Sequence, residues 1–117
     1  MNTTELGQFG ENIADRFLTE KGFQILDRNF RFKKGEIDII AEDNGVLVLI
    51  EVKTRQTAEI GEPWRAVTRA KQRQIIQVAN NYIQSRQITK NARFDIVSIV
   101  TNSYRTSIEH ITDAFYP

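Results

Sequence analysis

Three carboxylates and one amine lie within a short stretch of the sequence, and their types and spacing point to metal chemistry. The chain reads Gly35-Glu36-Ile37-Asp38, then a spacer, then Glu51-Val52-Lys53. Carboxylates such as Asp38 and Glu51 supply the hard oxygen ligands that Mg²⁺ or Mn²⁺ prefers. Lys53 stands two positions after Glu51, so both side chains share one face if this stretch is a strand. The pattern predicts a metal site suited to phosphodiester hydrolysis, with the lysine stabilising developing negative charge.

Two apolar stretches joined by a tight turn must position these side chains. Residues 36–42 and 46–53 are rich in Ile, Val and Leu. Asn44-Gly45 between them is typical of a two-residue hairpin turn, because both central residues of such a turn adopt positive φ. The sequence therefore predicts an antiparallel hairpin.

The two-residue turn determines which residues face each other. Asp38 faces Glu51 and Glu36 faces Lys53, with the Cβ atoms of opposed residues roughly 4.5–5.5 Å apart. A slip of one residue would bring carboxylates against the apolar face, which fixes the parity of the register. A four-residue turn keeps this parity and leaves open the alternative in which Asp38 faces Lys53. The expected apolar pairs on the other face are Ala41 with Val48, Ile39 with Ile50, and Ile37 with Val52.

The hairpin and several other stretches resemble known families. The Asp38, Glu51 and Lys53 pattern resembles the Asp…Glu-x-Lys core of restriction-endonuclease-like nucleases, and its spacing fits the archaeal Holliday-junction resolvases of that superfamily. The whole chain is similar to the YraN family of small bacterial proteins. The matching stretches are Gly10-Glu11-Asn12-Ile13-Ala14 with Phe17-Leu18, Lys21-Gly22-Phe23-Gln24-Ile25-Leu26, Arg28-Asn29-Phe30-Arg31, Gly35-Glu36-Ile37-Asp38-Ile39-Ile40, Ile50-Glu51-Val52-Lys53-Thr54-Arg55, Ala66-Val67 with Lys71-Gln72, and Arg93-Phe94-Asp95.

The resemblance implies a fold, a cofactor and roles for particular residues. It implies a restriction-endonuclease-like domain that uses Mg²⁺ or Mn²⁺. Glu36 and Gln72 are candidates for auxiliary roles beside the main set. The residues that the superfamily pattern assigns are Glu11, Asp38 and Glu51 as metal ligands and Lys53 as the catalytic lysine, all four of them catalytic candidates.

The remaining sequence predicts one α/β domain, residues 1–117, with a mixed, largely antiparallel central sheet flanked by helices. An apolar stripe at helical spacing starts the chain, and Gly22 is expected to stop that helix. We expect a strand over residues 23–32, a polar loop over 54–62 and a second strand pair around Asn102-Ser103. The stripe of the first helix consists of Leu6, Phe9, Ile13, Ala14, Phe17 and Leu18.

A second long helix is predicted from Glu62-Pro63 to about Arg86, since Pro suits a first helical turn. Between Pro63 and Phe94 the sequence contains seven basic residues and no acidic one, although the whole chain carries a net charge of only +1. Such a strip attracts phosphate backbones, yet charged helix faces are also common without a ligand. Its buried face is expected to hold Trp64, Val67, Ile75, Val78 and Tyr82. The nucleic-acid-binding candidates are Arg65, Arg69 and Arg73 on one face, Lys71, which either reaches toward the substrate or only snorkels, and Arg55 after the hairpin.

Composition narrows the class of protein further. With 40% hydrophobic and 26% charged residues the chain is globular in composition. No stretch approaches a membrane span or a signal core, and the absence of cysteine excludes disulfides and thiolate metal sites. These features favour a cytoplasmic protein without a membrane partner, and a homodimer stays open. The single histidine, His110, is expected to be structural.

We therefore expect a Mg²⁺-dependent nuclease that acts on DNA in preference to RNA, with a resolvase-like preference for branched structure. One alternative is a non-catalytic nucleic-acid-binding module with the same fold. Another is a scaffold protein in which the polar strand face forms only an ion-pair network of Glu36, Asp38, Glu51 and Lys53.

Overall fold

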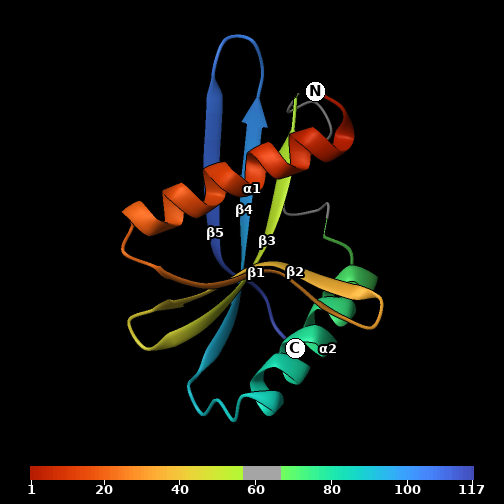
Figure 1. Ribbon diagram of the computed structural model, residues 1–117, viewed down its shortest axis with the longest axis vertical. Helices are drawn as coiled ribbons and strands as arrows, with labels where there is room; N and C mark the ends of the chain where they lie inside the picture. The colour runs from red at the N-terminus through yellow and green to blue at the C-terminus, as the bar shows by residue number, and fades with distance from the viewer. Residues whose placement is uncertain (57–66) are drawn as a thin grey trace.

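Five strands and two helices make up the described part of the chain (Figure 1). The structure, a computed structural model, describes residues 1–56 and 67–117. The strands form one sheet in the order β1-β2-β3-β4-β5, in which β3 and β4 are parallel and the other neighbours are antiparallel. The predicted α/β class with a mixed, largely antiparallel sheet is confirmed. The elements are α1 (Thr3–Glu20), β1 (Gln24–Phe32), β2 (Gly35–Asp43), β3 (Val46–Arg55), α2 (Arg69–Ser85), β4 (Ala92–Thr101) and β5 (Thr106–Phe115).

The two helices cover opposite faces of the sheet. In β3, Leu47 and Leu49 pack in the cluster beneath α2, whereas Val48 and Ile50 pack in the cluster beneath α1. This alternation explains why the strand is apolar on both faces. Neither of the two described helices is long and apolar enough to span a membrane.

Helix α1 starts and ends as the sequence predicts, and Ile13, Ala14, Phe17 and Leu18 of its predicted stripe pack against the sheet, but Phe9 does not. Asn2 caps its start in a capping box with Glu5, and Gly22 follows its end with a φ of +98°. The fully buried residues are Gly10, Ala14 and Leu18, whereas Phe9 of the predicted stripe is 37% exposed. The prediction for Phe9 is wrong because two small residues, Gly10 and Ala14, allow the helix to approach the sheet along their own line.

The β2–β3 hairpin has the predicted register. Asn44 and Gly45 both have positive φ, and the ladder runs from Asp43–Val46 to Ile39–Ile50. The predicted second hairpin is also present, with β4 and β5 pairing up to Thr101–Thr106. The local turn chemistry was therefore sufficient to place both strand pairs.

The two hairpin strands separate at Asp38, which the sequence did not predict. Ile39 packs beneath α1, but Ile37 packs beneath α2, so the strand changes parity between them. The ladder with β3 ends at Ile39, and the Asp38 carboxylate accepts a hydrogen bond from the Val52 amide at 2.8 Å. The predicted apolar pair Ile37–Val52 and the direct ladder pairs of Asp38 and Glu36 are thus wrong. The fork between β2 and β3 opens a gap in the sheet instead.

Helix α2 begins later than predicted. Thr68 is extended, and its hydroxyl accepts a hydrogen bond from the Lys71 amide, which makes it the N-cap. The predicted start at Glu62-Pro63, the position of Trp64 and the loop from residue 57 onward fall outside the described residues. The rest of the predicted buried face is confirmed, with Val67, Ile75, Val78 and Tyr82 all buried.

Candidate functional site

A hollow of about 280 Å³ opens at the fork between β2 and β3. Because the sheet is open at this point, side chains from both helix layers reach the same space. All four residues that the family resemblance assigns line it. The lining consists of Thr3, Leu6, Gly7 and Glu11 from α1, Asp38 from β2, Glu51, Val52, Lys53 and Thr54 from β3, and Lys71 from α2.

The close contact of α1 with β3 places Glu11 at this hollow. A Cβ atom added to Gly10 would lie 1.8 Å from the Thr54 hydroxyl oxygen, so no side chain fits there. Glycine therefore lets the helix backbone lie directly against the strand. Glu11, the next residue, is held over the fork with a side chain only 17% exposed.

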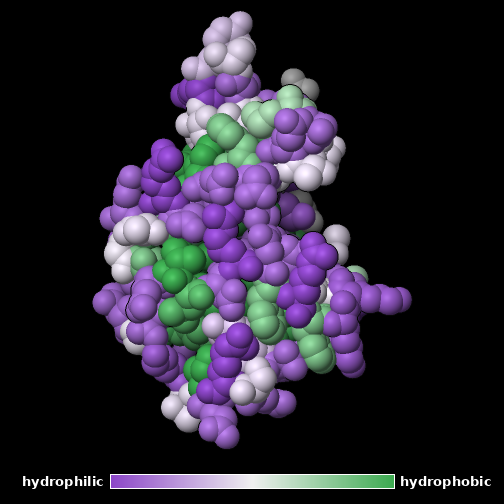
Figure 2. Space-filling model, in the orientation of Figure 1, coloured by the Kyte–Doolittle hydropathy of each residue, from purple (hydrophilic) through white to green (hydrophobic). Residues whose placement is uncertain are grey.

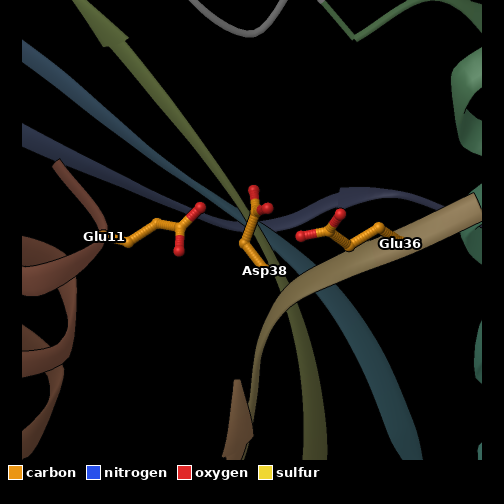
Figure 3. Close-up of side chains that lie close together, drawn as sticks. All are labelled: Glu11, Glu36 and Asp38. Carbon is orange, nitrogen blue, oxygen red and sulfur yellow. The ribbon is translucent and has the colours of Figure 1, made fainter. Parts of the chain in front are cut away.

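Three carboxylates converge in the fork, as Figure 3 shows. Each of Glu11, Glu36 and Asp38 offers an oxygen, and these oxygens lie within 4.8 Å of one another. Glu36, expected only as an auxiliary residue, thus joins the acidic group. It does not take the predicted place beside Lys53: its carboxylate accepts a hydrogen bond from Asn29 at 3.0 Å and forms an ion pair with Arg31 at 3.1 Å.

Asn29 holds two of these carboxylates, and sequence reasoning missed it. Its amide nitrogen donates hydrogen bonds to Glu11 at 2.9 Å and to Glu36 at 3.0 Å. Its φ of +52° is a left-handed conformation that asparagine tolerates better than most residues. In the β1–β2 register, Asn29 lies opposite Asp38 between two regular pairs. An asparagine inside a predicted strand, where it is disfavoured, was the signal available in the sequence.

Glu51 is a buried acid with incomplete partners. Its side chain is 5% exposed, and its Oε2 atom has no hydrogen-bond partner. Lys71 Nζ forms an ion pair with that oxygen at 3.6 Å, a distance too long for a hydrogen bond. Lys71 therefore reaches toward the site, the first of the two alternatives that the sequence left open. A buried carboxylate oxygen without a donor costs free energy unless something else compensates its charge.

The pKa values of Asp38 and Glu11 are both raised, chiefly by burial. Burial, followed by a hydrogen bond to Glu51 and the charge of that group, raises the pKa of Asp38 to about 8. Burial also raises the pKa of Glu11, although its hydrogen bond from Asn29 opposes the shift. Without a cation, Asp38 therefore holds a proton at neutral pH.

These residues fit a hard divalent cation. The donor set is entirely carboxylate oxygen, which suits Mg²⁺ or Mn²⁺. The oxygen of Glu51 that lacks a donor and the proton held by Asp38 are both features that a cation would remove. The residues that could hold it are Asp38 and Glu51, with Glu11 and Glu36 on either side of Asp38 (Figure 3).

The other candidate residues that the structure describes do not line the hollow. Arg69 and Arg73 are exposed at the start of α2, and Arg55 ends β3, half-buried. Gln72 is not in the hollow, because its side chain donates to the Val67 carbonyl at 3.1 Å. Arg65 lies outside the described residues.

A second buried carboxylate, Asp95, lies on the α1 face of β4 with all its partners present. It accepts hydrogen bonds from Arg93 at 3.1 Å, from the Asp113 amide at 3.1 Å and from His110 Nε2 at 2.8 Å. Lys21 can only donate, so the 2.7 Å contact with His110 Nδ1 leaves Nε2 as the protonated ring nitrogen. Burial alone would raise the pKa of Asp95, but these hydrogen bonds together outweigh burial, so the pKa is lowered from its ordinary value.

Comparison with known proteins gives one consistent result. The sequence model of a family described as "Uncharacterised protein family UPF0102" matches residues 10–99. A UPF0102 protein of Flavobacterium psychrophilum is 41% identical over 112 residues, covering 96% of this chain and 94% of that protein. One of Geobacter metallireducens is 43% identical over 116 residues, covering 98% and 95%. One of Caldicellulosiruptor saccharolyticus is 47% identical over 104 residues, covering 87% of each.

Proposed function

The chain belongs to the family UPF0102, the YraN family of the sequence resemblance, and we propose that it is a Mg²⁺- or Mn²⁺-dependent nuclease that hydrolyses phosphodiester bonds in DNA. The observation that carries this proposal is the Glu51 oxygen without a hydrogen-bond donor, buried in a hollow that Glu11, Asp38 and Lys53 also line. A divalent cation is the partner that such a set of carboxylate oxygens suits.

The hollow contains the groups that phosphodiester hydrolysis needs. A bound Mg²⁺ or Mn²⁺ would neutralise charge on the phosphate and make a water molecule more acidic. Lys53 follows Glu51 on the same strand face, where its ammonium can donate to a phosphate oxygen and stabilise charge that develops on it. Lys71 adds a second ammonium from α2 on the same side of Glu51. Glu11 and Glu36 both accept hydrogen bonds from Asn29, which fixes the positions of these two carboxylates beside Asp38.

The proposed substrate is DNA, with a preference for branched structure. The likeness to Holliday-junction resolvases in the hairpin pattern supports this preference. The exposed Arg69 and Arg73, two positions before and after Lys71 on α2, support a polyanionic substrate.

Direct metal binding is the first test. Calorimetric titration of the metal-free protein with Mn²⁺ should show binding that Asp38→Asn and Glu51→Gln each abolish, because each change removes ligand charge at nearly constant volume. Asp15→Asn, which changes an acid of α1 outside the hollow, is the matched control and should bind normally. Equal binding by Glu51→Gln and the control would refute the site.

Cleavage is the second test. Purified protein with Mg²⁺ or Mn²⁺ should cut labelled four-way junctions, and the comparison set is linear duplex, single-stranded DNA and RNA. Lys53→Ala should bind Mn²⁺ normally yet cut about 10²- to 10³-fold more slowly, as expected for loss of one transition-state donor. Undiminished cutting by Lys53→Ala would point to a contaminating nuclease. A parent protein that binds these nucleic acids and cuts none of them would be the non-catalytic binding module instead.

A further inference from the structure

A groove separate from the acidic hollow runs between the β1–β2 turn and α2. Its volume is about 520 Å³, and it is lined by Lys33, Lys34, Gly35, Gln74 and Gln77. None of these residues lines the acidic hollow. In Figure 2, hydrophilic side chains project from the β1–β2 turn at the right of the molecule, above α2.

The turn is held firmly against the helix. A Cβ atom added to Gly35 would lie 2.6 Å from a Val78 methyl group and 3.2 Å from the Gln74 carbonyl oxygen, so Gly35 is packed on α2 with no room for a side chain. Lys33 has a φ of +56°, a left-handed conformation that turns the chain at this point. The two lysines are therefore carried on a fixed turn, which lowers the entropy lost when they bind a ligand.

The charge on the groove is not neutralised by the protein. Lys33, Lys34, Arg69 and Arg73 are exposed, and none of them forms an ion pair with the described residues. Helix α2 contains no acidic residue at all between Arg69 and Ser85. Its groove side offers the amides of Gln74 and Gln77. Basic groups mixed with side-chain amides, without acids, are the set that contacts phosphates and sugars in nucleic-acid complexes.

The groove lies close to the acidic hollow along β2. Gly35 is three residues before Asp38 on this strand, a separation of roughly 10 Å at about 3.3 Å per residue. Each strand of a duplex carries one phosphate per about 3.4 Å of helix axis. A nucleic acid bound at the carboxylates therefore carries further phosphates within reach of the groove.

We propose that this groove binds the sugar–phosphate backbone of the substrate a few nucleotides from the bond that is cut. Lys33 and Lys34 contact phosphates from one wall, and Gln74 and Gln77 contact the backbone from the other. This proposal rests on the proposed function in naming a nucleic acid as the partner. It extends the binding surface from the start of α2 to the β1–β2 turn.

Binding without cleavage tests the groove independently of catalysis. In EDTA, fluorescence anisotropy would measure the affinity of a labelled 20-base-pair duplex, the same single strand and the matching RNA at several salt concentrations. Lys33→Gln/Lys34→Gln should weaken binding about tenfold or more at low salt and should lower the log–log salt slope by about 1.8 units, or roughly 0.9 per phosphate contact. The three probes identify which backbone the groove prefers.

A matched control removes the same charge elsewhere. Arg16→Gln/Arg105→Gln changes two exposed arginines that lie away from both the groove and the acidic hollow. This control should keep the parent affinity and slope. Gln74→Ala/Gln77→Ala, which leaves the charge unchanged, should weaken binding without changing the slope. Mn²⁺ titration should give the same affinity for all three variants.

The outcomes separate this proposal from the proposed function. Lysine-dependent binding by a parent that cuts nothing would support the groove and refute the nuclease. Cutting by the parent, combined with equal binding of the lysine variant and the arginine control, would refute the groove and leave the nuclease intact. Binding of the parent and the lysine variant to phosphatidylserine vesicles tests an anionic lipid surface in the same way. If the lysine variant lost vesicle binding but kept the parent's affinity for nucleic acid, the groove would not be a nucleic-acid site.

Discussion

Glu51 and Asp95 are both buried carboxylates in the same sheet, on the neighbouring strands β3 and β4, yet their surroundings are opposite. Asp95 is fully buried and accepts hydrogen bonds from Arg93, His110 and a backbone amide. Glu51 is 5% exposed and keeps one oxygen without a donor, and its neighbour Asp38 has a pKa raised to about 8. Burial alone therefore does not distinguish a structural acid from a functional one. The distinction lies in whether the protein itself supplies the compensating donors.

The two regions should respond to mutation with opposite signs, and this is the largest expected effect. Asp95→Ala should destabilise the protein by about 3 kcal/mol, because it removes the acceptor that holds Arg93 and His110. Asp38→Asn should instead stabilise the metal-free protein at neutral pH, because folding no longer has to add a proton to a buried carboxylate whose pKa is raised. Urea unfolding in EDTA measures both. Asp15→Ala, which removes a half-exposed ion pair with Arg28, should change stability by less than about 1 kcal/mol and serves as the control. Equal destabilisation by Asp95→Ala and Asp38→Asn would remove the contrast.

A divalent cation should stabilise only through the acidic hollow. Mn²⁺ at a hundred times its dissociation constant should add about 2.7 kcal/mol to the free energy of unfolding of the parent protein. Glu51→Gln should lose this increment, since it removes a ligand charge. Asp95→Asn, if it remains folded, should keep the increment, because its carboxylate already has its donors. Thermal unfolding with and without Mn²⁺ measures the difference, and an increment retained in Glu51→Gln would argue against the contrast.

The pH dependence of stability should differ in sign between the two acids. The pKa of Asp38 is raised from 3.8 to about 8, so the folded state binds this proton more tightly than the unfolded chain does. The metal-free protein should lose stability as the pH rises from about 4 to about 8, by up to about 1.4 kcal/mol per pH unit from this group. The pKa of Asp95 is lowered, so its contribution should be lost only in acid, as the pH falls below the ordinary range of an aspartate.

Urea unfolding in EDTA at pH 5, 6.5 and 8 measures this slope. Asp38→Asn should flatten it while leaving His110 and every other titrating group in place. A parent protein whose stability rises from pH 5 to pH 8 as much as that of Asp38→Asn would show that Asp38 does not hold its proton.

The smallest expected effect concerns Asn29, which donates hydrogen bonds to two of the converging carboxylates. Asn29→Gly removes the amide that bonds Glu11 and Glu36, and glycine accepts the left-handed φ of +52° without strain. Mn²⁺ affinity should fall about tenfold, the usual lower range for a residue that orients metal ligands. The control is Asn12→Ala, which removes exposed hydrogen bonds from Arg28 and Gln8 and keeps a residue that suits the helix. Unchanged Mn²⁺ affinity in Asn29→Gly would show that Glu11 and Glu36 do not need the hydrogen bonds from Asn29 to bind the cation.

Much of the site could be predicted because the signals were local. Asn44-Gly45 determined the hairpin register, and the register brought Asp38 near Glu51. The change of parity at Asp38 could not be predicted, because Ile37 is apolar and fits a core on either face of the sheet. For the same reason the sequence paired Glu36 with Lys53 rather than with Asn29. The alternation of apolar and polar residues gives the face of a strand only where the strand is regular.

The partners that come from distant parts of the chain were harder to predict. Lys71 lies on the apolar side of α2, where a lysine more often only snorkels, and only the tertiary structure shows it near Glu51. The environment of Asp95 combines residues from β4, β5 and the end of α1, which no local pattern connects. His110 was expected to be structural, and its position between Asp95, Lys21 and the Phe17 and Phe23 rings agrees with that expectation.

The division of the site between two parts of the chain has a consequence for how the protein is made. Glu11, Glu36, Asp38, Glu51 and Lys53 all precede residue 56, whereas Lys71 follows it on α2. Strands β1 to β3 pair through short hairpins, but β3 and β4 are parallel and can pair only after the connection that contains α2 has been synthesised. During synthesis the acidic residues of the hollow therefore leave the ribosome before Lys71, whose ammonium pairs with Glu51. We expect the acidic fork to be among the last regions to settle, with α1 docking over it only once β4 supports the far side of β3.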